Sequence, residues 1–412
     1  MEMVLEFLRD VLSQPALLIG IMSCVGLVAL KRPFHKVMTG TLKPILGYLM
    51  LAAGAGVIVS NLDPLGKMIE HGFHITGVVP NNEAIVAVAQ KVLGVETMSI
   101  LVVGLLMNLC IARFTKFKYV FLTGHHSLFM ACLMSAVLGT AGLSGMELIL
   151  VGGFLMGAWS AISPAIGQSY TSKVTDGDEI AIGHFGSLGY YLSAWVAQYV
   201  GKAEDSTEDI EIPEKWGFLR DSTLSTALTM IVFYLIAAIA AGSEFVSTLS
   251  GDMSPYLYAV MSAMNFAVGV TIVYSGVRMI LGDLIPAFQG IATKIIPNAI
   301  PAVDCAVFFT YAPTAVVLGF LSSFIGGIIG MLILGAVGGV LIIPGLVPHF
   351  FCGATAGIYG NATGGRRGAA VGAFLNGLAI TFLPAMALPV LGQLGFQNTT
   401  FGDADFAVMG LV

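Results

Sequence analysis

Long apolar runs separated by short polar segments fill the chain from Pro15 to Leu391. A membrane-spanning helix needs roughly 20 mostly apolar residues, and this length test predicts about ten or eleven transmembrane helices. The runs are Pro15–Leu30, Pro44–Ser60, Thr97–Ala112, Tyr119–Ala141, Met146–Ile166, Leu224–Val246, Tyr256–Val277, Ala302–Phe320, Phe324–Ile343, Leu346–Ile358 and Ala369–Leu391. The pattern therefore predicts an all-α polytopic membrane protein.

The most polar segment of the chain, GKAEDSTEDIEIPEKWGFLRDS, covers residues 201–222. We interpret it as a cytoplasmic linker between a first half, residues 1–200, and a second half, residues 223–412. Each half contains one polar segment that glycines interrupt: IAIGHFGSLGYY near 180–200 and GATAGIYGNATGGRRG near 353–368. We predict that both segments form re-entrant hairpins.

Two pairs of short segments favour an internal repeat. ILGYLMLA, from Ile45, and ILGDLIPA, from Ile280, share five residue types at matching positions, and a proline lies three residues before both Glu83 and Asp304. If the halves are inverted repeats, the binding site of a transporter is expected at the interface between them.

Composition and charge narrow the class of protein. Hydrophobic residues make up 57% of the chain and charged residues 10%, and the mean hydropathy of +0.90 excludes a water-soluble globular protein. Lysine and arginine cluster after the first and third runs and around 201–222, which places those loops in the cytoplasm. The five cysteines lie singly in apolar runs, so we expect neither a disulfide nor a metal site.

The glycine-interrupted segments are the first candidates for a ligand site. Backbone that leaves helical geometry inside a bilayer must be buried in protein or line a cavity. Gly183, Gly186, Gly364 and Gly365 would let the chain turn close to a ligand, although close packing of helices is the alternative explanation. Asn361 and Thr363 lie beside the second pair of glycines and are candidate binding residues.

Ionisable residues inside apolar runs are the second group of candidates. His125 and His184 each follow a glycine, and a neutral imidazole can both donate and accept a hydrogen bond, which suits a polyhydroxylated ligand. Asp304 has no cation in its own apolar run, and sugar hydroxyl groups could serve as its partners. Glu83 would play the corresponding part in the first half. The alternative for each is a polar residue that other core residues satisfy.

Several longer motifs resemble one family. They are TGH at 123–125, TDGDEIAIGH at 175–184, GVRMILGDLIPAFQGI at 276–291, VDCAVFFTYAPTAVVLGF at 303–320, LIIPGLVPHFFCGATAGIYGNATGGRRGA at 341–369 and FGDADF at 401–406. From about residue 15 to its end, the chain resembles the IIC membrane component of the bacterial phosphotransferase system, ascorbate type, in the ascorbate and galactitol superfamily.

The resemblance implies a homodimer in the bacterial inner membrane, with a scaffold domain and a core domain that moves across the membrane like an elevator. It matches His125, His184 and Asp304 to substrate-binding positions. It also implies that the chain itself is not an enzyme, because a cytoplasmic IIB partner, supplied by IIA, phosphorylates the sugar. We expect no catalytic residue, cofactor, metal or nucleic-acid partner.

Two positions differ from the ascorbate-binding members, which carry glutamine where this chain has Phe129 and Phe185. Phenylalanine removes amide hydrogen bonds and adds an apolar wall, so L-ascorbate and a related sugar or polyol remain alternative substrates. The family also continues into a last transmembrane helix where this sequence ends, so the resemblance predicts that this helix is incomplete.

Two other classes of transporter are alternatives. An ion-coupled secondary sugar transporter would use Asp304 or Glu83 as its proton site and would need no partner protein. A passive channel would need a continuous open path, which closing hairpins disfavour.

Overall fold

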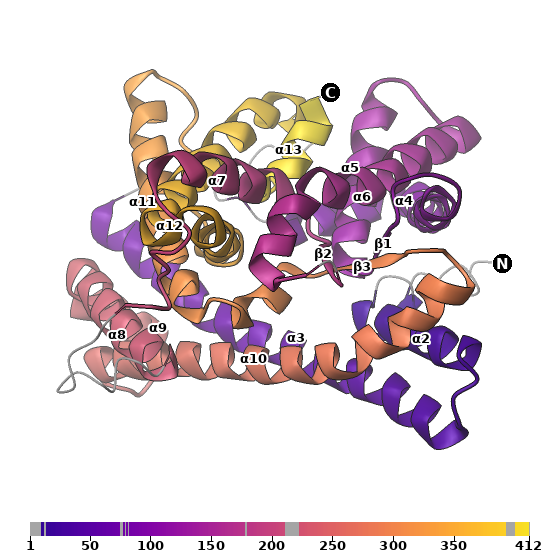
Figure 1. The fold of residues 1–412 in the computed structure, drawn as a ribbon. Helices are drawn as coiled ribbons and strands as arrows, with labels where there is room; N and C mark the ends of the chain where they lie inside the picture. The colour runs from indigo at the N-terminus through magenta and orange to yellow at the C-terminus, as the bar shows by residue number, and fades with distance from the viewer. Residues whose placement is uncertain are drawn as a thin grey trace.

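A computed structural model describes residues 10–11, 14–74, 77–78, 80, 82–177, 179–210, 222–392 and 400–411 (Figure 1). The helices of the first half are α2 (Pro15–Ala29), α3 (Phe34–Phe73), α4 (Asn82–Phe114), α5 (Gly124–Thr140), α6 (Gly145–Thr175) and α7 (Ser187–Val200). Those of the second half are α8 (Ser222–Ala241), α9 (Ser243–Ser250), α10 (Pro255–Lys294), the short 3₁₀ helix η2 (Cys305–Thr310), α11 (Pro313–Ala336), α12 (Leu346–Gly392) and α13 (Ala404–Leu411).

Most of the described chain is helical. Six of its helices are long and apolar enough to cross a membrane, and α8 and α9 make a seventh if this pair, bent by 116°, counts as one span. The predicted class, a polytopic helical membrane protein, is therefore confirmed. The number of spans, ten or eleven, stays a prediction.

Two predicted spans are wrong as single helices. The run Tyr119–Ala141 is strand β1 (Tyr119–Phe121), a turn and then α5. The run Ala302–Phe320 contains the end of strand β3 (Ile300–Val303), then η2 and the start of α11. A sequence pattern cannot distinguish strands this short from helical segments. They contain too few residues to show whether the apolar positions repeat every two residues, as in a strand, or every 3.6, as in a helix.

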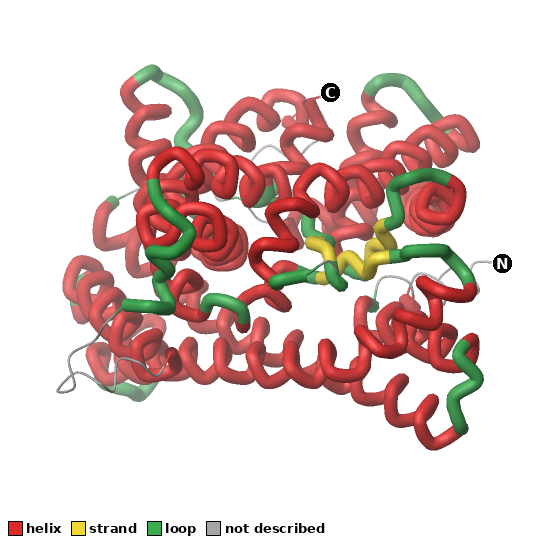
Figure 2. The backbone as a smooth tube through the Cα atoms, in the orientation of Figure 1, coloured by secondary structure: helices red, strands yellow, loops and turns green. Residues whose placement is uncertain are grey.

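A small parallel sheet lies in the middle of the molecule, with strand order β1-β3-β2 (Figure 2). Phe121 of β1 pairs with Ala302 of β3, and Ile182 of β2 (Ala181–Ile182) pairs with Val303 on its other side. The sheet was not predicted. The side chains of Val120, Phe121, Ala181, Ile182, Ala302 and Val303 are all buried. This non-helical segment therefore lies inside the protein, as backbone outside a helix must in a membrane protein.

Helices α3 and α10 lie side by side along one edge of the molecule (Figure 1). A β-carbon on Gly47 would lie 2.9 Å from the carbonyl oxygen of Gly276, and one on Gly54 would lie 2.8 Å from that of Gly269. The helices therefore run in opposite directions, and small residues let their backbones approach closely, which is the usual way that membrane helices associate.

Helix α12 is interrupted at Gly364 and Gly365, where the backbone leaves helical geometry. Gly365 has a φ of +60°, and a β-carbon there would lie 2.3 Å from the carbonyl oxygen of Lys202. Residues 201–210, which we call the strap, fill this position: the amide of Arg366 donates to the carbonyl of Asp205 over 2.8 Å. In the segment predicted to be a hairpin, residues 353–363 are helical, and the break at Gly364 and Gly365 follows them.

Candidate binding site

The three strands of the sheet bring the predicted polar residues together. Parallel strands end at the same edge of a sheet. At that edge, β3 is followed directly by Asp304, β2 leads into His184, and the turn after β1 leads into His125 at the start of α5. The amide of Gly183 donates to the carbonyl of Val303 over 2.7 Å, so the pairing continues up to the residue before His184.

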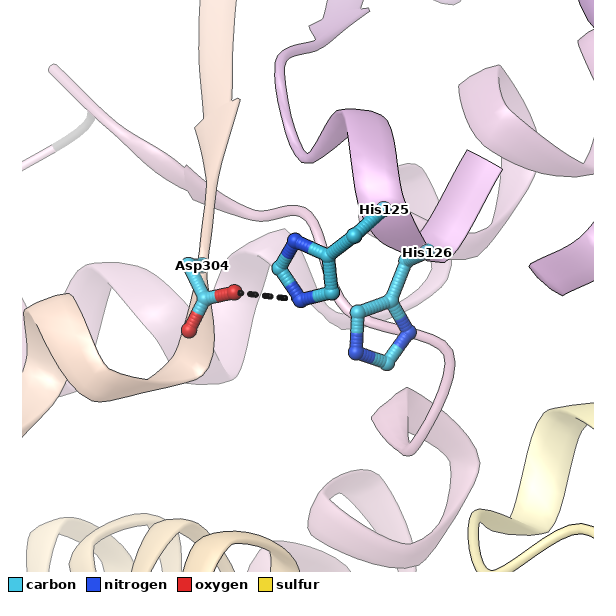
Figure 3. Close-up of side chains that lie close together, drawn as sticks. All are labelled: His125, His126 and Asp304. Carbon is cyan, nitrogen blue, oxygen red and sulfur yellow. Dashed lines mark ion pairs between the residues drawn. The ribbon is translucent and has the colours of Figure 1, made fainter. Parts of the chain in front are cut away.

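His125 and Asp304 point toward each other from α5 and from the end of β3 (Figure 3). The His125 Nε2 and the Asp304 Oδ2 atoms are 3.5 Å apart. The other carboxylate oxygen of Asp304 accepts from the amide of Ala306 over 3.0 Å, and this bond fixes the side chain at the start of η2. On the opposite side, the Tyr48 hydroxyl of α3 is 3.4 Å from the His125 Nδ1.

His184 lies against a second imidazole. The ring centroids of His126 and His184 are 3.8 Å apart, and both side chains are buried. The amide of Phe185 donates to the His126 Nδ1 over 3.4 Å. Three imidazoles and one carboxylate, contributed by three elements, therefore meet at one place.

Two further polar residues belong to the site, Asn82 at the start of α4 and Asp403 just before α13. The Asn82 Nδ2 donates to the Asp403 Oδ2 over 2.6 Å, and the amide of Gly402 donates to the Asn82 Oδ1 over 2.8 Å. Sequence reasoning missed both. The available signals were the asparagines that precede Glu83 and the carboxylates of the FGDADF motif, neither of which lies in an apolar run.

These groups line a cavity of about 720 Å³. Its deep end carries Tyr48, Asn82, His125, His126, Phe129, His184, Asp304 and Asp403, and its other end reaches Asp63, Lys67 and Glu70 on α3. Lys67 and Asp63 are mostly exposed and lie 2.8 Å apart as an ion pair, so this end is the mouth of the cavity. The volume is in the range of small-molecule sites.

The C-terminal segment holds the turn that carries His184. The Asp405 carboxylate accepts from the amide of Leu188 over 2.9 Å and from the Ser187 hydroxyl over 2.7 Å, at the first turn of α7. It also accepts from the Trp159 indole over 3.2 Å, and its own amide donates to the carbonyl of Phe185 over 2.9 Å. Asp405 therefore caps α7 and joins it to α13.

The structure does not bring Asn361 and Thr363 to the cavity. The Asn361 side chain accepts from the amide of Thr207 over 2.8 Å and donates to Ser206, both in the strap. The Thr363 hydroxyl donates to the carbonyl of Ala194 over 2.9 Å. Gly364 and Gly365 lie with them against α7 and the strap, and their binding role stays a prediction that this placement does not support. The polar side chains of Asn361 and Thr363 instead form hydrogen bonds that hold the broken part of α12 against the strap and α7.

The remaining candidates are placed as follows. The backbone of Glu83 is in α4, but its side chain lies outside the described residues. Gly183 packs against β3, where a β-carbon would lie 2.5 Å from the carbonyl oxygen of Ala302, and Gly186 donates its amide to His184. Phe129 lines the cavity. Phe185 is fully buried and stacks on Phe121 at 4.7 Å.

Two groups of side chains have the ligand types of a metal site: His125 with His126 and Asp304, and His184 with Cys352 and Asp403. In each group one atom per residue lies within 4.8 Å of the others. The second group, however, is already hydrogen bonded, since the Cys352 thiol donates to the Asp403 Oδ1 over 2.7 Å. The expectation that the chain binds no metal stays a prediction.

Comparisons with known proteins identify the family of the chain. A family model described as a PTS system sugar-specific permease component, EIIC-GAT, matches residues 10–405. The chain is also similar to the ascorbate-specific PTS system EIIC component of Mycoplasma pneumoniae, with 27% identity over 424 residues. The match covers 88% of this chain and 63% of that protein, so the chain spans less than two thirds of its relative's length.

Proposed function

The chain belongs to the family of sugar-specific permease components of the phosphotransferase system, and from this we propose that it carries L-ascorbate or a related sugar or polyol inward for phosphorylation by a cytoplasmic IIB partner. Membership of this family and the apolar helices identify a multi-pass protein of the cytoplasmic membrane. The observation that carries the proposal is the cavity in which His125, His184 and Asp304 meet.

The chemistry of the cavity supports a ligand with many hydroxyl groups. The carboxylates of Asp304 and Asp403 accept hydrogen bonds, and the amide of Asn82 can donate or accept them. Each neutral imidazole has one donor nitrogen and one acceptor nitrogen. A hydroxyl group donates once and accepts, so a polyol or a sugar-like lactone can satisfy such a mixed set. Phe129 adds one apolar wall for the carbon face of the ligand.

The spacing of the elements supports an internal repeat, and the opposite directions of α3 and α10 are those expected of inverted copies. Helix α3 begins at Phe34 and α10 at Pro255, 221 residues apart, and α5 begins at Gly124 and α12 at Leu346, 222 apart. Val78 pairs in parallel with Ile342. A shift of 222 residues takes Val78 to Ile300 in β3 and takes Val120 in β1 to Ile342. Val120 pairs with Pro301, the residue after Ile300. The bridge between Val78 and Ile342 is therefore the counterpart of the β1–β3 pairing, with an offset of one residue.

A division into scaffold and core follows from the same elements. We assign α2, α3, α8 and α10 to a scaffold that dimerises, and the sheet with α4–α7 and α11–α13 to a core that moves like an elevator. The cavity lies between them, because α3 supplies one wall and the sheet edge the other. Movement of the core would carry a bound ligand past α3, and the IIB partner would then phosphorylate it.

A binding screen on the purified protein tests this function. Radiolabelled L-ascorbate, galactitol, pentitols and hexoses are compared, and we expect saturable binding of at least one of them. His184→Ala and Asp304→Asn should abolish it, because each removes a group from the deep end of the cavity. The matched controls are His349→Ala, whose imidazole bonds to Ser323 outside the cavity, and Asp283→Asn on α10, and both should bind normally.

Uptake into vesicles separates this function from ion-coupled transport, which the His125–Asp304 pair could also serve. The proposed function predicts that uptake needs IIA and IIB, supplied with phosphoryl groups from phosphoenolpyruvate by the general proteins of the phosphotransferase system, and that it survives a protonophore. Uptake that needs no partner protein and stops with the protonophore would instead identify a secondary transporter. Normal binding by His184→Ala or Asp304→Asn would remove that residue from the site.

A further inference from the structure

Two donors converge on one nitrogen of His184. The amide of Gly186 donates to the His184 Nδ1 over 3.1 Å, and the Tyr190 hydroxyl lies 2.8 Å from the same atom. A backbone N–H can only donate, so Nδ1 must act as the acceptor and carries no proton. The proton of the neutral ring is therefore on Nε2, because the bond made by one ring nitrogen sets the state of the other.

The Tyr190 hydroxyl begins a chain of contacts that returns to the cavity. It lies 3.5 Å from the Cys352 Sγ, a packing contact, because the single hydroxyl proton is directed to the His184 Nδ1. The Cys352 thiol donates its own proton to the Asp403 Oδ1 over 2.7 Å. His184 and Asp403 line the cavity, whereas Tyr190 and Cys352 are fully buried and do not. This series of contacts therefore connects His184 and Asp403, in the wall of the cavity, through Tyr190 and Cys352 behind it.

We propose that Tyr190 and Cys352 are positioning residues, which hold His184 as an N–H donor and Asp403 as an acceptor toward the substrate. The inference rests on the proposed function, since it assumes that the cavity binds the sugar. It also specifies the ligand further. A ligand that fits must offer an oxygen acceptor to the Nε2–H of His184 and a hydroxyl donor to Asp403. A zinc ion bound by His184, Cys352 and Asp403 is disfavoured, because their ligand atoms already form hydrogen bonds. The His184 Nδ1 accepts from the amide of Gly186, and the Cys352 thiol donates to the Asp403 Oδ1.

The tautomer can be measured without a ligand. Solid-state NMR of the full-length protein labelled with ¹⁵N-histidine distinguishes protonated from unprotonated ring nitrogens, and the spectrum of His184→Gln identifies the His184 signals by their loss. We expect the proton on Nε2. A proton on Nδ1 would overturn the proposal.

Binding variants test the positioning role. Tyr190→Phe and Cys352→Ala should each weaken binding of radiolabelled L-ascorbate by about tenfold, the effect of losing one buried hydrogen bond of about 1.4 kcal/mol. Cys352→Ser should bind within about threefold of the native protein, because serine keeps a donor and an acceptor. A purely structural role would give no such rescue.

The chain offers closely matched controls. Tyr191, the next residue of α7, also donates a buried hydroxyl, to the carbonyl of Ser163 over 2.8 Å, and Cys132 is a buried thiol of α5. Tyr191→Phe and Cys132→Ala should keep native affinity. Equal affinities for Tyr190→Phe and Tyr191→Phe would refute the positioning role. If the native protein binds none of the screened ligands, the proposed function fails, and the NMR measurement still decides the state of His184.

Discussion

At the scale of single residues, the two phenylalanines singled out in the sequence lie in different surroundings. Phe129 lines the cavity beside His125, with ring centroids 5.7 Å apart. Phe185 instead belongs to an aromatic cluster with Phe121 and Phe406. Only Phe129 lines the cavity, so any effect of these two positions on substrate preference should come from Phe129.

We expect Phe129→Gln to change the affinity for L-ascorbate relative to polyols by about tenfold, since one amide hydrogen bond is gained at the cavity wall. Its melting temperature should stay near that of the native protein. Phe185→Gln is the contrasting variant. It buries an amide among aromatic rings, and the free energy of unfolding should fall by about 3 kcal/mol. Unchanged relative affinities in Phe129→Gln would assign specificity to other residues.

Residue-level reasoning from the sequence found part of the lining of the cavity. His125, His184 and Asp304 were predictable because polar side chains in apolar runs are costly unless they have partners or ligands. Asn82 and Asp403 were not, because both lie in short polar connections where such residues are common. Asn361 and Thr363 also looked like candidates, but the backbone of the strap and of α7 supplies their hydrogen-bond partners, and no sequence pattern indicates that packing.

At the scale of elements, the position of His184 depends on the cap of α7. A helix begins with unpaired amides, and Asp405, which follows more than 200 residues later, accepts from one of them at Leu188. Long-range contacts of this kind are invisible to local sequence patterns. The same is true of the parallel sheet, whose strands are only two to four residues long.

Asp405→Ala should lower the melting temperature and weaken ligand binding together. The change leaves the Leu188 amide and the Ser187 hydroxyl without their acceptor, at a cost of about 2 kcal/mol for buried donors that have lost their partner. Asp405→Asn keeps an acceptor oxygen and should lose less in both measurements. If Asp405→Ala loses stability but binds with native affinity, the cap supports the fold without positioning His184.

At the scale of the whole molecule, α3 and α12 meet at the cavity. Gly66 and Leu346 both line it, and a β-carbon on Gly66 would lie 3.7 Å from the Leu346 Cδ1. In the proposed elevator motion these helices belong to different parts, so their contact must break during each transport cycle. If α3 and α12 did not move relative to each other, this contact would persist through the cycle.

Cross-linking tests this motion. In the double variant Gly66→Cys with Leu346→Cys, mercuric ion should bridge the thiols and stop uptake into vesicles, and dithiothreitol should restore it. The single variants, treated in the same way, control for reaction at the native cysteines. Uptake that continues while the bridge is intact would contradict a movement of α12 past α3.

The order of the strands has a consequence for biosynthesis. In the sheet, β3 from the second half lies between β1 and β2 from the first. During translation, β1 and β2 leave the ribosome well before β3 and have no partner until Val303 has been made. The nascent first half therefore waits in the membrane with two open strand edges, and this interval is when insertion factors would be needed to shield it.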